Sequence, residues 1–346
     1  MKKTLISASV ASVLTLVSFA TLAEGPSFYG RLDLAVTNSD KGATTQNGKE
    51  GTVLENNFSL LGVKGSEKFA NGIELLYQME FQVENTTQTA DKSGDEVVFK
   101  ARNTFLGLKS DAGTVLVGRN DTVFKQSEGG IDLFGNFNAD IDRMIGGQLR
   151  RADGIWYYSP VIAGLVTLNA TYLMDDNYEG SDEDQYALSA TLGDKGLKAQ
   201  PYYIAAAYNT IGGIDAYRGV AQVKLGEFKL GGLYQNTESQ TTDQEGDSFF
   251  LNVSYNLNGV NLKAEYGQDE AGFGSYYKNI KDVNGNAASN LDVNITQITV
   301  GADYRISKST LVYGHYAMYE GDHKVGTATV DLEDDNIFTV GARYDF

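Results

Sequence analysis

The sequence predicts an all-β fold in which antiparallel strands close into a single barrel, and three observations lead to this prediction. Apolar and polar residues alternate with a period of two along most of the chain, which is the pattern of half-buried strands. The connections between these alternating segments are short and long in turn. The 346 residues include 39 Gly and 21 Tyr but only three Pro, a composition typical of a long hydrogen-bonded sheet with tight turns.

The N-terminal residues are expected to be removed rather than to fold. Two lysines precede an apolar stretch, and small residues end this stretch at Ala23. This is the pattern of a secretory signal peptide. We therefore predict a signal peptide over 1–23 and a barrel domain over 24–346; the alternative is an N-terminal membrane anchor helix.

The charge and the cysteine content restrict the class of protein. The formal net charge is −17, and loss of the two N-terminal lysines takes it to −19. Such an acidic chain is not expected to bind nucleic acid, because neutralising phosphates needs clustered Lys and Arg. The chain has no Cys, so an exported product must be held together without disulfides. After the expected signal, no stretch approaches the 18 apolar residues of a membrane-spanning helix.

The clearest alternation lies in the segment 73–84. One face carries apolar side chains, namely Ile73, Leu75, Tyr77, Met79, Phe81 and Val83. The other face is mostly polar and consists of Glu74, Leu76, Gln78, Glu80, Gln82 and Glu84. A helix with 3.6 residues per turn would mix these two sets, so the segment is a strand.

Sixteen segments of this kind follow one another to the end of the chain. We expect strands at 27–39, 56–69, 73–85, 101–111, 113–124, 154–160, 164–175, 184–193, 197–209, 215–226, 228–240, 246–257, 260–270, 294–306, 309–320 and 334–346. Most of them reach the 9–11 residues that a tilted strand needs to cross a bilayer. The long connections between them are 40–55, 86–100, 125–153, 176–183, 241–245, 271–293 and 321–333.

Hydrogen bonding explains why such a chain would close in a membrane. In hydrocarbon every backbone N–H and C=O must be paired within the protein, and only helices and closed barrels achieve this. The polar face then lines the lumen, which sixteen strands make too wide for side chains to fill. The predicted fold is therefore a transmembrane antiparallel 16-stranded β-barrel with short periplasmic turns and long extracellular loops.

Several short segments, taken in order, resemble the general porins of Gram-negative bacteria over nearly the whole mature length. The segments that carry the resemblance are Phe28–Asp33, Ser59–Glu67, Gly113–Arg119, Ile155–Pro160, Tyr304–Thr310 and the terminal Phe346. The resemblance implies a homotrimer in the outer membrane, with the third loop folded inward to narrow each pore. It also implies that Phe346 is an assembly signal for the barrel-assembly machinery.

The third long connection, roughly 120–153, is the candidate functional segment, because long structureless loops are usually functional or disordered. Its acidic candidates for the pore constriction are Glu128, Asp132, Asp140 and Asp142. The resemblance implies that arginines of the barrel wall face these acids, and the candidates are Arg31, Arg102 and Arg119. Position 60 is Leu, where many relatives of that family carry an inward Arg. With the acidic net charge, this predicts weak cation selectivity.

The function expected from these features is passive diffusion of small hydrophilic solutes and ions, without cofactor or metal. A substrate-specific channel of the same fold, for oligosaccharides, phosphate or another nutrient, remains the alternative. A barrel enzyme is not expected, because acid–base catalysis usually draws on His and the chain has only two, His315 and His323. A second acidic cluster at 175–184 could bridge lipopolysaccharide phosphates through divalent cations, or it is simply a solvated loop.

Overall fold

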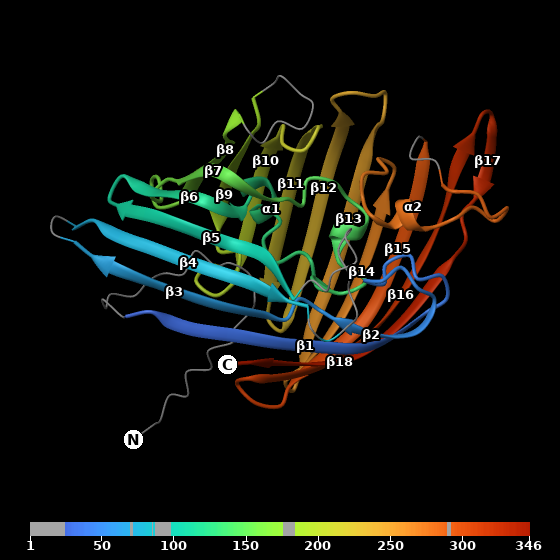
Figure 1. The fold of residues 1–346 in the computed structure, drawn as a ribbon, viewed down its shortest axis with the longest axis horizontal. Helices are drawn as coiled ribbons and strands as arrows, with labels where there is room; N and C mark the ends of the chain where they lie inside the picture. Colours follow the sequence, from blue (N-terminus) through green and yellow to red (C-terminus); the bar gives the residue numbers. More distant parts are fainter. Residues whose placement is uncertain (1–24, 70–71, 85, 87–97, 176–183, 289–291) are drawn as a thin grey trace.

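The computed structural model describes residues 25–69, 72–84, 86, 98–175, 184–288 and 292–346. The expected signal peptide and most of the second acidic cluster lie outside these residues. The described residues form one large antiparallel sheet with short helical turns (Figure 1). Within them, no helix has the length and apolarity needed to cross a membrane.

The strands follow one another along the chain with few helical interruptions. They are β1 Ser27–Ser39, β2 Gly51–Asn56, β3 Leu60–Lys68, β4 Glu74–Val83, β5 Phe99–Ser110, β6 Gly113–Asp121, β7 Arg150–Tyr158, β8 Val166–Leu173, β9 Tyr186–Gly193, β10 Tyr202–Asn209, β11 Ile214–Leu225, β12 Phe228–Ser239, β13 Glu245–Leu257, β14 Val260–Asp269, β15 Val293–Arg305, β16 Thr310–Val325, β17 Ala328–Asp331 and β18 Asp335–Asp345. The helical turns are α1 Val123–Gln126, η2 Ile141–Arg143 and α2 Tyr276–Asn279.

The sheet closes on itself and has sixteen wall positions, as predicted. β1 pairs with β18 at the seam, in a register that runs from Arg31↔Asp345 to Ser39↔Ile337. β2 and β3 both pair with β1 and form one wall strand, which is interrupted where Phe58 takes a φ of 61°. β17 pairs with the outer end of β16 and extends that hairpin beyond the wall. The predicted loop 321–333 thus contains a hairpin that the sequence did not reveal.

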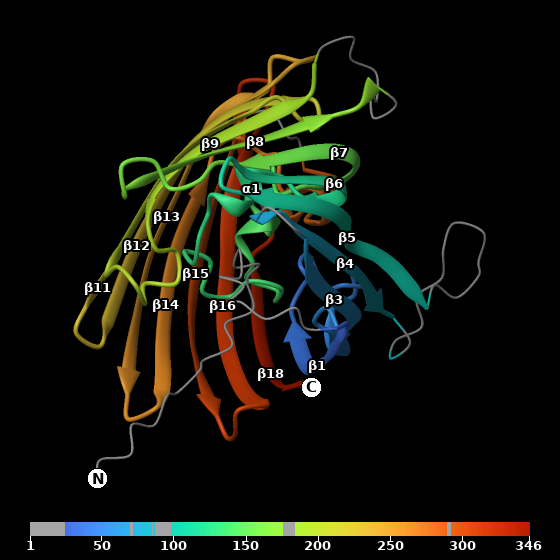
Figure 2. The same cartoon turned by 90° about the vertical axis from the view of Figure 1, so that its left-hand side faces the viewer.

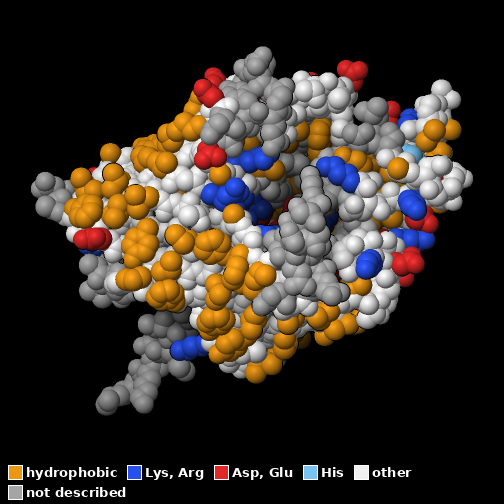
Figure 3. Space-filling view, viewed as in Figure 1, with side chains coloured by type: hydrophobic (Ala, Val, Ile, Leu, Met, Phe, Trp, Pro, Cys, Tyr) orange, Lys and Arg blue, Asp and Glu red, His pale blue; other side chains and the backbone are white. Residues whose placement is uncertain are grey.

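The alternation along each strand separates an apolar outer face from a polar inner face. On β4, Met79 and Phe81 are 47% and 40% exposed, whereas Glu80 is only 7% exposed. The apolar side chains that cover the outer wall in Figure 3 belong to this outward set. The inner face is polar and partly enclosed, as expected for a barrel with a wet lumen.

The connections at the two ends of the barrel differ in length, although less strictly than predicted. Tight turns join β5 to β6, β11 to β12 and β13 to β14 at one end. The opposite end carries the 28-residue connection 122–149 and the connection 270–292. It also carries the short connection 210–213, and the first end carries the longer turn 194–201. The prediction therefore holds for the trend and not for every connection.

The connection between β6 and β7, residues 122–149, lies inside the barrel (Figures 1 and 2). We refer to this segment as the third loop. It buries large apolar side chains completely, among them Phe124, Ile131, Ile141 and Met144. These pack with inward apolar residues of the wall, including Val220 and Leu233. The predicted inward-folded loop is confirmed, and it has a hydrophobic core of its own within the lumen.

Candidate functional site

The third loop starts on β6 with a capped helical turn that fixes its direction. The Thr122 hydroxyl accepts a hydrogen bond from the Lys125 amide and caps α1, as expected for an N-terminal Thr. The guanidinium of Arg218 on β11 lies 4.1 Å from the Phe124 ring centroid. It also donates to the Phe124 carbonyl over 3.1 Å. Arg218 therefore holds the start of the loop against the wall through both a cation–π contact and a hydrogen bond.

The middle of the loop is fixed to β11, β13 and β14 by side chains of the wall. The Gly130 amide donates to Gln222 on β11 over 3.0 Å. The Asn252 amide of β13 donates to the Ile131 carbonyl. The ammonium of Lys263 on β14 donates to the Leu133 carbonyl over 3.0 Å. These bonds satisfy backbone groups that an irregular segment cannot pair within itself.

The tip of the loop crosses the barrel and docks at the seam between β1 and β18. The side-chain amide nitrogen of Asn138 donates to the Glu55 carboxylate over 2.8 Å. Its side-chain oxygen accepts a hydrogen bond from the Thr339 hydroxyl over 3.0 Å. The Thr37 hydroxyl donates to the same Glu55 oxygen over 2.6 Å. The hydroxyl of Tyr319 donates to the Asn138 backbone carbonyl over 2.8 Å. We call this group of contacts the tip anchor.

The four acidic candidates lie on the third loop, and all are partly exposed within the lumen. Asp132 accepts from the Phe134 amide over 2.9 Å. Asp140 accepts from the amides of Asn136 and Asp142 over 2.5 and 2.9 Å. Glu128 accepts from Gln148. These bonds fix three of the carboxylates on the loop, and the fourth, Asp142, lies 3.6 Å from Arg143 of the same loop.

Crowding of the acids changes their protonation. Burial, followed by the charge of the nearby Asp140, raises the pKa of Asp142 to about 6, against the attraction of Arg143. Burial, followed by Asp140, holds the pKa of Asp132 well above its usual range. Burial also raises the pKa of Glu128, against the attraction of Lys125. The structure thus brings the four acids into one electrostatic group.

Two of the three basic candidates of the wall are paired with acids of the wall itself. Arg102 on β5 contacts Glu80 on β4 at 2.6 Å. Glu80 also accepts from the Tyr29 hydroxyl over 2.9 Å. Arg31 on β1 contacts Asp345 on β18 at 2.9 Å, at the seam. Arg31 and Arg102 are thus each paired with a carboxylate of the wall.

Arg119, the third basic candidate, is placed elsewhere by the strand register. It lies two positions beyond Val117 in the β5–β6 ladder, in which Leu106 and Val117 are paired. Both of these residues are more than half exposed on the outer face, and the same alternation directs Arg119 outward. The β6–β7 register shifts between Gly118 and Asn120, an irregularity that the sequence pattern did not show. We therefore correct the prediction and leave Arg119 out of the candidate constriction.

The structure adds a basic residue that sequence reasoning assigned only to the loop. Arg150 begins β7 and contacts Asp121 at 3.1 Å, and it donates to Asn103 over 2.6 Å. The charge of Arg102 acts on both members of this pair, so Arg102 and Arg150 belong to one region of the wall. Only the pairing register, and no motif, could have placed Arg150 there. Figure 3 shows a central hollow with Lys and Arg side chains at its rim.

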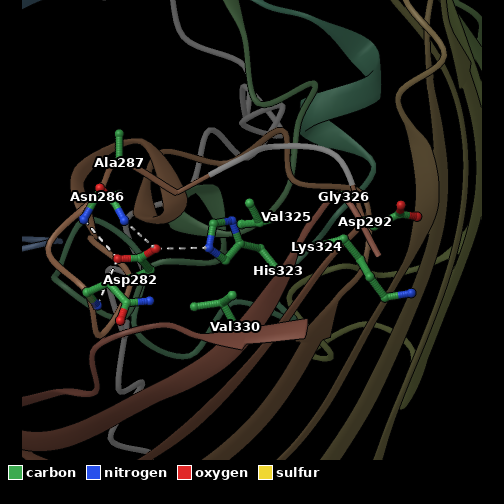
Figure 4. A pocket seen from close by; sticks show the side chains of 10 residues that line it. Asp282, Asn286, Ala287, Asp292, His323, Lys324, Val325, Gly326 and Val330 are labelled. Atoms are coloured by element: carbon green, nitrogen blue, oxygen red, sulfur yellow. Dashed lines mark hydrogen bonds and ion pairs between the residues drawn. The ribbon is translucent and has the colours of Figure 1, made fainter. Parts of the chain in front are cut away.

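A separate hollow lies between the connection 270–292 and the β16–β17 hairpin (Figure 4). There the Nε2 atom of His323 lies 3.7 Å from the Asp282 carboxylate. Asp282 also accepts from the backbone amides of Asn284 and Asn286. The arrangement ties two external connections together. Among the described residues, no three His, Cys, Asp or Glu side chains are grouped so that they could hold a metal ion.

Comparison with known proteins places the chain in a family. The family model described as Gram-negative porin matches residues 8–324. The chain belongs to this family. The porin is 28% identical over 331 residues to the outer membrane porin protein OmpD of Salmonella typhimurium, with 87% of each chain covered. It is 26% identical over 289 residues to the major outer membrane protein P.IB of Neisseria lactamica, covering 76% of this chain and 77% of that protein. The match to the P.IB protein of Neisseria sicca spans half of that relative.

Solved structures show the same fold. The anion-selective porin from Comamonas acidovorans has a TM-score of 0.68 at 19% identity, with 93% of this chain and 99% of that chain covered. OmpF of Salmonella typhi, solved with daunomycin, also has a TM-score of 0.68, at 16% identity with 93% and 97% covered. The predicted family and barrel are therefore confirmed. The porin is a channel of the outer membrane and not an enzyme.

Proposed function

We propose that this porin is a general diffusion channel with weak cation selectivity. The solutes are small and hydrophilic, and they pass between the third loop and the opposite wall. The observation that carries the selectivity is the unequal pairing of charges. Arg31, Arg102 and Arg150 each have a wall carboxylate as partner. Of the four loop acids, only Asp142 has an ion-pair partner among the described residues, namely Arg143 at 3.6 Å. A lumen in which the acids dominate favours cations.

The residues proposed for the constriction are Glu128, Asp132, Asp140 and Asp142 on the loop side. Arg102 and Arg150 are proposed for the wall side. Arg31 stays a candidate for the wall of the pore near the seam. It lies on β1, whereas Arg102 lies on β5 and Arg150 on β7. The separation of opposite charges across the opening sets up a transverse field that orients polar solutes.

Reversal potentials of the purified protein in planar bilayers test the selectivity. A gradient of KCl across the membrane should give a potential of the sign that marks faster K⁺ passage. A potential of the opposite sign would rule out the proposal. Addition of neutral sugars should lower the current only in proportion to solution viscosity. A saturable block by one neutral sugar would instead identify a substrate-specific channel.

We further propose that residues 1–23 are cleaved, and that 24–346 forms the barrel in a homotrimer within lipid and lipopolysaccharide. One solved structure with the same fold, OmpT of Vibrio cholerae, is of a trimer form. Mass measurement of the detergent-solubilised protein by light scattering tests the trimer. A monomer mass in mild detergent contradicts it.

The C-terminal residue is proposed as the signal for the barrel-assembly machinery. Phe346 completes the seam, because its amide donates to Gly30 over 3.0 Å and its carbonyl accepts from the Gly30 amide over 2.9 Å. The Phe346 ring covers Gly30 so closely that a β-carbon at position 30 would lie 2.3 Å from it. The side chain is exposed on the outside of the barrel.

A further inference from the structure

Three lysines form a row across the inner wall on the tight-turn side of the third loop. In the strand registers, Lys224 on β11 lies opposite Lys229 on β12, Lys229 lies opposite Ser254 on β13, and Ser254 lies opposite Lys263 on β14. All four positions therefore share one level and one face of the sheet. We call this row the lysine arc.

The face of the arc is the lumen. Lys224 lies two positions after Gln222, a buried residue that accepts a hydrogen bond from the third loop. At the other end, Lys263 reaches the Leu133 carbonyl of the third loop, and its ammonium lies 5.7 Å from the Phe134 ring centroid. The arc thus lies immediately beside the third loop, between it and the tight turns at 226–227 and 258–259.

The arc has a surplus of positive charge. Lys263 contacts Asp303 at 2.5 Å, but Asp303 also accepts from the Asn261 amide over 2.7 Å. Among the residues that the structure describes, neither Lys224 nor Lys229 makes an ion pair. The charges that act on Lys229 are those of Lys224, Lys263, Lys198 and the single acid Asp303. Like charges directly opposite one another destabilise a sheet, and Lys224 and Lys229 lie directly opposite one another.

We propose that the lysine arc is a binding subsite for small oxyanions that carry two or more negative charges, such as inorganic phosphate and pyrophosphate. One such anion would offset the repulsion between the ammonium groups and accept charge-assisted hydrogen bonds from them. The Ser254 hydroxyl adds a neutral donor in the middle of the row. The subsite lies on the periplasmic side of the constriction, so an anion arriving from the periplasm meets the arc before it meets the acids of the third loop.

This subsite goes beyond the proposed general diffusion and has a separate consequence for conductance. A multivalent anion held in the arc would stand in the lumen beside the third loop and obstruct the passage of other ions. Monovalent ions would be bound too weakly to have this effect, because their attraction to the arc is about half or less of that of a divalent anion at the same distance. Obstruction should therefore depend on anion valence and on the side of addition.

Inorganic pyrophosphate, added to one compartment at a time, tests the proposal in single-channel recordings in dilute KCl at neutral pH. Periplasmic addition should lower the current in a saturable manner, and raising the KCl concentration should weaken the block through screening. The variant K224Q/K229Q should require a half-blocking concentration higher by about tenfold or more, from the loss of two charge-assisted contacts. The variant K308Q is the matched control, because it removes an exposed lysine from the neighbouring turn 306–309.

The outcomes separate clearly. Weaker block in K224Q/K229Q with unchanged block in K308Q supports the subsite. Equal block in wild type and K224Q/K229Q overturns it, and so does an equal loss in K308Q, which would indicate only the general field of the periplasmic rim. Absence of any block at millimolar pyrophosphate also overturns it. The conductance before pyrophosphate is added reports independently on general diffusion and on correct folding of each variant, and Lys→Gln at these positions removes a repulsion rather than a packing contact.

Discussion

Replacing Asn138 by Ala should release the tip of the third loop and make the channel noisy. Asn138 is 2% exposed and Glu55 is 1% exposed, so the substitution leaves a buried carboxylate without one of its donors. Loss of a hydrogen bond to a charged group, together with loss of the neutral bond to Thr339, removes about 2–4 kcal/mol. That free energy corresponds to a population of undocked tips higher by roughly 30- to 700-fold.

The measurement is the open-channel current noise and the frequency of spontaneous closures at fixed voltage. N138A should show more of both, because the loop then moves in the path of the ions. Asn38→Ala is the matched control, since Asn38 lies on the exposed side of the same wall, where its amide donates to Thr52. Adding Glu55→Gln to N138A should recover part of the loss, because it removes the unpaired charge. If N138A recordings are indistinguishable from those of N38A, the tip anchor does not hold the loop.

Four further outcomes follow from the charges and from the seam. Cation preference should fall as the pH is lowered from 7 to 5, because burial raises the pKa of Asp142 to about 6 and protonation then removes its charge; reversal potentials that are constant over this range would contradict the shift. The same raised pKa means that docking of the loop is most stable below the unfolded pKa of this carboxyl and loses stability as the pH rises through about 6. The variant R102Q should increase the K⁺/Cl⁻ permeability ratio by about two- to threefold, the effect of one charge several ångströms from the ion path in high dielectric, and reversal potentials that match wild type would remove Arg102 from the constriction. Deletion of Phe346 breaks two backbone bonds to Gly30, so less folded barrel should be recovered in the outer membrane, as measured by heat-dependent electrophoretic mobility; full recovery would show that the residue is dispensable.

The barrel was predictable because lipid and lumen act on alternate residues of every strand. The segment 73–84 shows this best, since Met79 and Phe81 face outward and Glu80 faces inward as their positions in the alternation require. The pattern also gave the third loop, because its length exceeds that of an ordinary connection. Both results depend only on local sequence.

Features that arise from contacts between distant segments could not be predicted in this way. Asn138 and Glu55 are 83 residues apart, and no local pattern pairs them. The face of Arg119 was not settled by the sequence, because its strand pairing, which shifts between Gly118 and Asn120 on the β7 side, is not visible in the composition of the segment. Arg150 looked like a loop residue, since only strand pairing sets it opposite Asp121.

The inner wall also departs from the simple rule that a lumen is polar. Val220 and Leu233 point inward and are almost fully buried, because the apolar side of the third loop rests on them. The rule that every inward side chain is polar and contacts water fails for these two residues. Their inward apolar side chains mark where the third loop packs on the wall, and they are consistent with the strand register.

Because the third loop packs on inward apolar residues of the wall, the width of the barrel and the width of the open passage are separate properties. The circumference of the wall is fixed by the number of strands and their pairing, but the free cross-section is what the loop leaves uncovered. Shortening or resculpting residues 122–149 could therefore widen or narrow the passage without altering a single ladder of the wall. Removal of the loop would expose the inward side chains of Val220 and Leu233 to water. Any enlarged variant therefore needs polar replacements at these two positions to keep the lumen hydrated and open.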